Sequence, residues 1–128
     1  MKTLDLVLRK KWYDLIQSGV KTEEYREIKP YWIRRLCELR SVGGRRPAMM
    51  TSHLAIFYSK NAHLLKYHIE THDVHFKNFD AVTFHLGYAK ERPSMTFAIK
   101  EIAIAEGKEE WGAEKDKVYF VIRLGERL

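Results

Sequence analysis

The spacing of apolar residues near the N-terminus predicts a short strand followed by a helix. Leu4, Leu6 and Leu8 are separated by single residues, which gives an extended segment one apolar face. From residue 10 to residue 18 the apolar positions recur at helical spacing, and Gly19 stands where helices commonly end in a left-handed residue. A strand, a short helix and a turn therefore open the chain.

A second helix is predicted from Pro30, because proline is favoured in the first turn of a helix. In the stretch PYWIRRLCELR that starts there, apolar residues repeat every three or four positions as far as Leu39 or Arg40. The glycines and proline of SVGGRRP then end the pattern. Beyond them HLAIFYS is compatible with a strand and NAHLLKYHIETH with a short helix. We interpret the region of about 38–78 as an insertion between two more regular ends.

Strand patterns return after Asp80. Apolar residues alternate through residues 82–86, 95–104 and 118–124, and the second run changes phase at Lys100-Glu101, which predicts a β-bulge. Short strands separated by turns, with helices placed early, are typical of a small closed or nearly closed barrel. We expect an α+β fold that is mostly β, with about five to six strands and two or three helices, in one domain over residues 1–128.

The stretch GVKTEEYREIKP, residues 19–30, does not fit this scheme. A half-buried strand alternates apolar and polar residues, whereas both faces here are polar or charged. Thr22, Glu24 and Arg26 lie on one face, and Glu23, Tyr25 and Glu27 lie on the other. Burying either face without partners is costly. Either the segment is a solvated loop, or one face borders a wet hollow where Glu24 and Arg26 pair and Lys21 reaches the rim.

Charge is distributed unevenly along the chain. The net charge is +6, and residues 1–50 hold 12 Lys/Arg against 6 Asp/Glu, whereas residues 51–128 hold 11 of each. Clustered cations favour a polyanionic partner because they release counterions from phosphates. A basic face with no partner is the alternative. The predicted phosphate contacts belong to a cluster of arginines, and they are Arg34, Arg35, Arg45 and Arg46.

The sequence carries no sign of export or membrane insertion. No run approaches the roughly 18 apolar residues of a spanning helix, and MKTLDLVLRKK does not resemble a signal peptide. We expect a cytoplasmic protein without a membrane partner. The single cysteine, Cys37, cannot form an internal disulfide, and its apolar surroundings predict a core position rather than a nucleophile.

A motif joins the first predicted helix to the anomalous segment. Gly19, Lys21, Glu24 and Arg26 form the pattern G-x-K-x-x-E-x-R directly after an apolar helix. In these residues the chain resembles the ASCH family, whose fold is a PUA-like β-barrel. The later stretches FDAVTFHLGY and EEWGAEKDKVYFVIRLGERL resemble the closing half of bacterial members. The resemblance covers roughly residues 3–37 and 79–128 and leaves the region between them unmatched.

The resemblance implies a cleft beside the barrel, with RNA or a modified nucleoside as the ligand class. Carried over residue by residue, the ligand-binding positions are Lys21, Glu24 and Arg26, with Thr22 and Tyr25 as neighbours. No cofactor is expected. The predicted function is that of an RNA- or nucleotide-binding ASCH-type protein.

Two other functions stay open at the level of the sequence. Some relatives resemble amidohydrolases of 4-acetylcytidine, which use a lysine and a threonine two positions before the motif arginine. In this chain Lys21 matches the lysine, but the residue two positions before Arg26 is Glu24. A hydrolase acting on a modified nucleoside or on single-stranded RNA would use Lys21 as a base and Glu24 to position a water or a metal. A protein-interaction module, in which the charged cluster is structural, is the third interpretation.

Histidines and aromatic residues give weaker signals. His68 and His72 would share a helix face, but such spacing arises often by chance, and no metal site is predicted. Trp12 is expected to pack in the core. Trp111 is flanked by Glu110 and Gly112 in a predicted turn, and it is the candidate for an exposed platform on which a base stacks.

Overall fold

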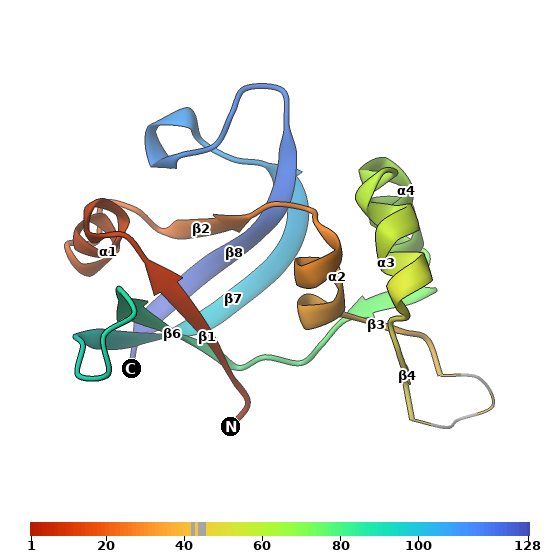
Figure 1. Ribbon diagram of the computed structural model, residues 1–128, viewed down its shortest axis with the longest axis horizontal. Helices are drawn as coiled ribbons and strands as arrows, with labels where there is room; N and C mark the ends of the chain where they lie inside the picture. The colour runs from red at the N-terminus through yellow and green to blue at the C-terminus, as the bar shows by residue number, and fades with distance from the viewer. Residues whose placement is uncertain (42, 44–45) are drawn as a thin grey trace. The chain divides into compact units, whose positions relative to one another are not determined.

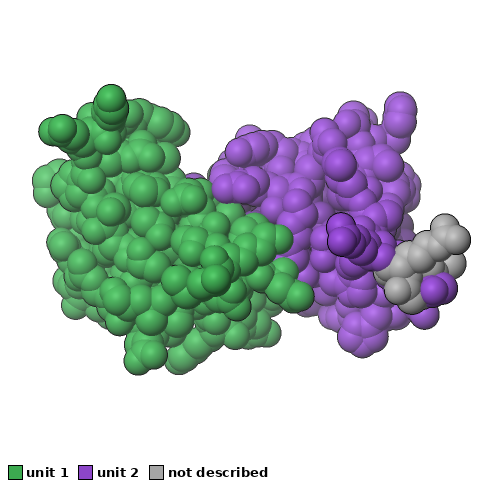
Figure 2. Space-filling view, turned by 90° about the horizontal axis from the view of Figure 1, so that it is seen from below, with its two compact units in different colours: residues 1–25, 78–128 green, residues 26–77 purple. Residues whose placement is uncertain are grey.

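The computed structural model describes residues 1–41, 43 and 46–128. The chain forms two compact units, coloured separately in Figure 2: unit 1 comprises Met1–Tyr25 and Asn78–Leu128, and unit 2 comprises Arg26–Lys77. Within the described part of the chain, no helix has the length and apolar character needed to cross a membrane. The predicted insertion of about 38–78 falls almost wholly in unit 2, and its interruption of a single domain stays a prediction.

Unit 1 is built on a curled five-stranded sheet, in the order β1-β6-β7-β8-β2 (Figure 1). Its elements are β1 (Thr3–Leu8), α1 (Lys10–Gln17), β2 (Glu23–Arg26), β6 (Ala81–Leu86), β7 (Ser94–Glu106), the short 3-10 helix η1 (Glu109–Trp111) and β8 (Val118–Arg127). The last residue of β2 belongs to unit 2. The predicted α+β fold with mostly strands is confirmed, and its identity as a PUA-like barrel stays a prediction. The expected two or three helices are too few, because the described residues form four α-helices.

The predicted strands at both ends of unit 1 are present. β1 runs parallel to β6, and the alternating Leu4, Leu6 and Leu8 are all buried. β7 and β8 form a long antiparallel ladder, and its register shifts between Ile99 and Glu101, which confirms the predicted bulge. In β8 the expected alternation is only partly right, because four consecutive residues, Tyr119–Ile122, are buried. This strand lies inside the sheet, and on its other face Tyr119 and Val121 form a buried hydrophobic cluster with Ala113.

The helix of unit 1 ends as the sequence predicts. Gly19 has φ +83°, which is the left-handed conformation expected after α1. The buried side chains of α1 are Tyr13 and Ile16, whereas Trp12 is only half-buried. Trp12 therefore lies at the border of the core, in reach of the residues that follow the turn.

In its described residues, unit 2 combines three helices with a small antiparallel sheet of order β4-β3-β5. Its elements are α2 (Pro30–Leu36), β3 (Cys37–Leu39), β4 (Ala48–Met49), α3 (Ser52–Ser59), α4 (Ala62–Glu70) and β5 (Val74–Phe76). α3 packs against α2 and α4, and α4 also packs against β5 (Figure 1). Pro30 is in the first turn of α2, as predicted.

Two predictions in this region are wrong. HLAIFYS forms helix α3 rather than a strand: the Thr51 hydroxyl caps it by accepting a hydrogen bond from the Leu54 amide at 3.2 Å. The helix from Pro30 ends at Leu36 instead of continuing to about residue 40, because Cys37 turns into extended backbone and pairs with Phe76 of β5. The short helix predicted in NAHLLKYHIETH is confirmed as α4.

Candidate functional site

The lysine and glutamate of the motif form a buried ion pair in unit 1. Lys21 follows the Gly19 turn, and its backbone amide donates to the Leu15 carbonyl at 3.0 Å, which ties the residue to the end of α1. Its ammonium donates to Glu24 Oε1 at 2.6 Å. Lys21 is 1% exposed and Glu24 is 5% exposed. The two charged groups that the sequence places on an open hollow are therefore covered by the protein.

Two aromatic rings complete the surroundings of Lys21. The ammonium nitrogen lies 5.5 Å from the ring centroid of Trp12 and 5.3 Å from that of Tyr25. An ammonium attracted by ring faces keeps its charge at a lower cost in a buried setting. The sequence gives no sign that these two aromatic residues meet at the lysine, because Trp12 belongs to α1 and Tyr25 to β2.

Tyr25 links the lysine to a polar network on the sheet. Its hydroxyl donates to Glu23 Oε1 at 2.8 Å and accepts from the Lys108 amide at 3.0 Å. Burial raises the pKa of Tyr25, and the carboxylate of Glu23 raises it further. The ring also contacts that of Tyr119, with the centroids 5.9 Å apart. Tyr25 is therefore held as a neutral hydrogen-bonding group.

Glu23, which accepts the hydrogen bond of Tyr25, also pairs with a residue of another strand. Glu23 Oε2 lies 3.3 Å from Arg123 Nε in β8, and Arg123 Nη1 lies 2.6 Å from Glu101 Oε2 in β7. The hydrogen bond that Arg123 donates to the Glu101 carboxylate is the main reason that the pKa of Arg123 is raised. Residues of β2, β7 and β8 thus pair with one another, and the charge of Glu23, which has no evident partner in the sequence, is neutralised. Arg123 and Glu101 were not among the predicted site residues, since strand pairing alone brings them to Glu23.

The remaining motif residues are placed differently. Thr22 is exposed, and its carbonyl accepts from the Leu124 amide at 3.0 Å. Arg26 is half-buried in unit 2, with its guanidinium carbon 5.2 Å from the ring centroid of Trp32. The predicted pairing of Arg26 with Glu24 stays a prediction. Among the motif residues, the structure pairs Lys21 with Glu24.

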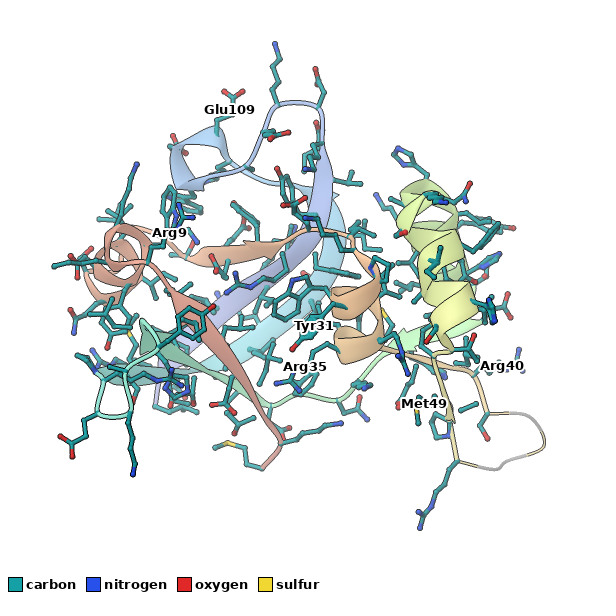
Figure 3. The ribbon with its side chains drawn as sticks, in the orientation of Figure 1. Arg9, Tyr31, Arg35, Arg40, Met49 and Glu109 are labelled. Atoms are coloured by element: carbon teal, nitrogen blue, oxygen red, sulfur yellow. The ribbon has the colours of Figure 1, made fainter. Side chains whose placement is uncertain are left out.

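The net positive charge of the protein comes from the residues of unit 2. Residues 26–77 contain 10 Lys/Arg and 4 Asp/Glu, a difference of +6, whereas unit 1 contains 13 of each. Arg34 and Arg46 are exposed and Arg35, which extends from α2 in Figure 3, is half-buried. Arg34 also donates through Nε to the Met50 carbonyl at 3.3 Å. Arg45 lies outside the described residues.

Trp111 is half-buried rather than fully exposed. The ammonium of Lys108 lies 4.4 Å from its ring centroid, so a cation already occupies one ring face. The next residue, Gly112, has φ +100° and brings its backbone against Trp12. The Trp111 platform is thus smaller than the sequence suggested.

Other reactive side chains are engaged in packing. His68 Nδ1 is hydrogen-bonded to the hydroxyl of Tyr58, a contact that joins α4 to α3. In the described ranges, no group of three or more His, Cys, Asp or Glu residues is arranged to hold a metal ion. Cys37 is fully buried, and burial raises its pKa to about 12. A thiol in this state is a poor nucleophile.

Comparison of the chain with protein-family models, with curated proteins and with solved structures finds no match. The resemblance to the ASCH family therefore stays an expectation from the sequence.

Proposed function

We propose that the protein binds RNA, or a nucleotide-sized part of it, as an ASCH-type protein with a PUA-like barrel. The observation that carries this proposal is the segregation of charge: unit 1 is neutral, and unit 2 alone has the net charge of +6. A unit with so strong a net positive charge attracts a polyanion. Because RNA is the expected ligand, we place this activity in the cytoplasm.

In this proposal the arginines of unit 2 contact phosphates. Arg34 and Arg46 have exposed side chains, and Arg35 is accessible in part. Such contacts supply affinity that does not depend on base sequence, and each one adds to the salt dependence of binding. Arg45, beside Arg46 in the sequence, belongs to the same proposed group.

The motif supplies the specific part of the proposed binding. Lys21, Thr22, Glu24, Tyr25 and Arg26 are the ligand residues that the family resemblance implies. Lys21 and Glu24 are buried as an ion pair, so in this proposal they fix the position of the segment that carries the ligand contacts, which lowers the entropy lost when a ligand binds. Of these five residues Thr22 is the most exposed, so in this proposal a ligand contacts Thr22 first.

Binding ranks above hydrolysis in our proposal for a chemical reason. A lysine acts as a general base only after it loses a proton. The Lys21 ammonium donates a hydrogen bond to the Glu24 carboxylate at 2.6 Å, so its proton is already engaged in that contact. An intact Lys21–Glu24 pair is therefore suited to holding a binding site in place rather than to proton abstraction.

The test is RNA affinity as a function of salt. A fluorescently labelled 12-nucleotide single-stranded RNA is titrated with the protein between 50 and 300 mM salt, and anisotropy is recorded. We expect a steep loss of affinity with salt. The double variant Arg34→Ala/Arg46→Ala should reduce the slope of log K against log salt by about 1.4, since each lost phosphate contact contributes about 0.7 for a single strand.

The matched control removes two exposed lysines from neutral unit 1. Lys100→Ala/Lys115→Ala lowers the net charge by the same amount, and it should leave the slope close to that of the unchanged protein. Absence of RNA binding, or equal effects of the two double variants, would contradict the proposal.

A further inference from the structure

The two consecutive helices of unit 2 expose faces with the same pattern. From the second residue of α3 to its C-cap, and within α4, the exposed residues fall at positions i, i+3, i+4 and i+7, which is one helix face; Ser52, at the start of α3, is exposed as well. On the first helix these residues are His53, Ile56, Phe57 and Lys60, and on the second they are His63, Lys66, Tyr67 and Glu70. Each face therefore presents an exposed aromatic ring next to a lysine.

A continuous row of four rings connects the two faces. Phe57 contacts Tyr58 with ring centroids 5.6 Å apart, Tyr58 contacts His68 at 5.5 Å, and His68 contacts Tyr67 at 6.0 Å. The inner two rings are joined by the Tyr58–His68 hydrogen bond, and Tyr58 is buried. The outer two rings are open to solvent, with Phe57 45% and Tyr67 58% exposed.

This arrangement holds two partly exposed aromatic rings in place at the surface of unit 2. Large exposed apolar side chains that are held in place and grouped together mark an interaction surface. Because the inner rings pack against each other, the outer rings lose little freedom when they bind a partner. The row therefore has the properties of a preformed stacking surface.

Charge selects the kind of partner. Among the eight exposed residues of the two faces there are two lysines, Lys60 and Lys66, and one acid, Glu70. The unit that carries them has a net charge of +6. A second copy of this chain would bring two strongly basic units together, which like-charge repulsion opposes. A polyanion with flat apolar groups matches both the charge and the rings.

We propose that α3 and α4 together form a binding surface for single-stranded RNA. Phe57 and Tyr67 stack on unpaired bases, and Lys60 and Lys66 contact the phosphates between them. This inference rests on the proposed RNA binding and extends it to a second surface, separate in sequence from the motif residues. It requires unpaired bases, because bases inside a duplex are not available for stacking on side chains.

The test compares aromatic and aliphatic truncations on the same helix pair. The probe is a mixed-sequence 12-nucleotide RNA, used as a single strand and as the perfectly paired duplex. Phe57→Ala/Tyr67→Ala should weaken binding of the single strand by about tenfold or more and leave binding of the duplex unchanged. Phe57→Tyr/Tyr67→Phe, which keeps both ring faces, should bind like the unchanged protein.

Ile56→Ala is the matched control. Ile56 is 47% exposed, nearly the same as Phe57, and it lies on the same face of α3 without a ring. Its truncation should have no effect on RNA binding. An equal loss of RNA affinity in Ile56→Ala would show that general hydrophobic contact, not stacking, holds the RNA, and it would overturn the inference. Unchanged thermal unfolding of each variant shows that the fold is kept, and the single variant Tyr67→Ala serves if the double variant unfolds.

A second readout follows stacking directly. A single strand with 2-aminopurine at its centre should lose fluorescence on binding the unchanged protein and retain it with Phe57→Ala/Tyr67→Ala. If RNA binding keeps its salt dependence but is unchanged in Phe57→Ala/Tyr67→Ala, the stacking surface is wrong and the proposed function still stands. No RNA binding by the unchanged protein would overturn both.

Discussion

Lys21 and Glu24 lie three positions apart in the sequence, and their charged groups meet at 2.6 Å with both side chains buried. A turn that ends α1 and the start of β2 provide this geometry, so the contact is local in the chain. Its burial is not local, because Trp12 and Tyr25 contribute the rings on which the ammonium lies. The pair thus connects the helix, the turn and the edge of the sheet in unit 1.

Removal of one partner of this pair should destabilise the protein more than removal of both. Glu24→Gln leaves the buried ammonium without the carboxylate it contacts, at a cost of about 3 kcal/mol in the free energy of unfolding. Lys21→Met/Glu24→Leu replaces both charges by apolar groups and should cost less than Glu24→Gln alone. Urea unfolding of Lys21→Met, Glu24→Leu and the double variant Lys21→Met/Glu24→Leu forms a double-mutant cycle that measures the coupling.

An exposed pair on α1 provides the control for this cycle. Lys10 and Asp14 lie 2.7 Å apart, but both side chains are exposed to solvent, where ion pairs contribute little. Their cycle should give almost no coupling energy. Equal coupling at the two pairs would show that burial does not determine the strength of the Lys21–Glu24 contact.

Stability should fall in alkaline solution through Tyr25. The folded protein raises the pKa of Tyr25 above the value of about 10 in an unfolded chain. Above about pH 10 the unfolded chain therefore loses this proton while the folded protein retains it, so the free energy of unfolding decreases as pH rises. Below about pH 10 the contribution of Tyr25 is fully present.

Tyr25→Phe should flatten this alkaline decrease, although it loses the two hydrogen bonds of the hydroxyl and is less stable at pH 8. Glu23→Gln should flatten it in part, because the Glu23 carboxylate contributes to the raised pKa. A residual decrease is expected, since burial raises the pKa of Tyr58 as well. Urea midpoints at pH 8 and pH 11 measure the effect, and identical profiles for Tyr25→Phe and the unchanged protein would be evidence against it.

Gly112→Ala should destabilise unit 1 more than Gly87→Ala. Both glycines have positive φ, so both substitutions carry the backbone strain of a left-handed residue. Only at Gly112 does the added Cβ also collide with a side chain, 2.9 Å from Trp12 Cζ2, whereas nothing lies within 4 Å at Gly87. We expect an additional loss of about 1–3 kcal/mol from this overpacking. Equal thermal unfolding midpoints would show that Trp12 moves aside without cost.

Cys37 should report the opening of unit 2. Its side chain is fully buried, and its pKa of about 12 leaves very little thiolate at pH 8. Reaction with a thiol reagent such as DTNB should therefore be slow in the folded protein and fast in urea. The labelling rate at low urea concentrations measures how often unit 2 opens. Rapid labelling of the folded protein without urea would show that the residue is not protected by the core.

Local patterns account for the parts of the fold that were predicted correctly. The alternation of Leu4, Leu6 and Leu8, the glycine after α1 and the phase change in β7 each involve residues close together in the sequence. HLAIFYS was predicted wrongly because it is apolar on most sides, so its period does not distinguish a strand from a helix. The Thr51 cap and the packing of this segment against α2 stabilise the helix.

The candidate site was only partly predictable for the same reason. The motif singled out Lys21 and Glu24, and the structure brings them together. The rings around Lys21 and the pairing of Glu23 with Arg123, 100 positions away, depend on the neighbours that β2 acquires in the sheet. The ring row of α3 and α4 became visible only after α3 proved to be a helix, since its exposed face has helical spacing.

The sequence by itself determined where strands and helices with one apolar face occur, and it determined the basic net charge, because periodicity and composition are properties of the chain alone. Tertiary structure decided which charges are buried, which partners they meet, and that the whole excess of positive charge falls in one unit. These outcomes follow from which segments pack together. The cost of burying an ion depends on the groups that surround it in space, not on its neighbours in sequence.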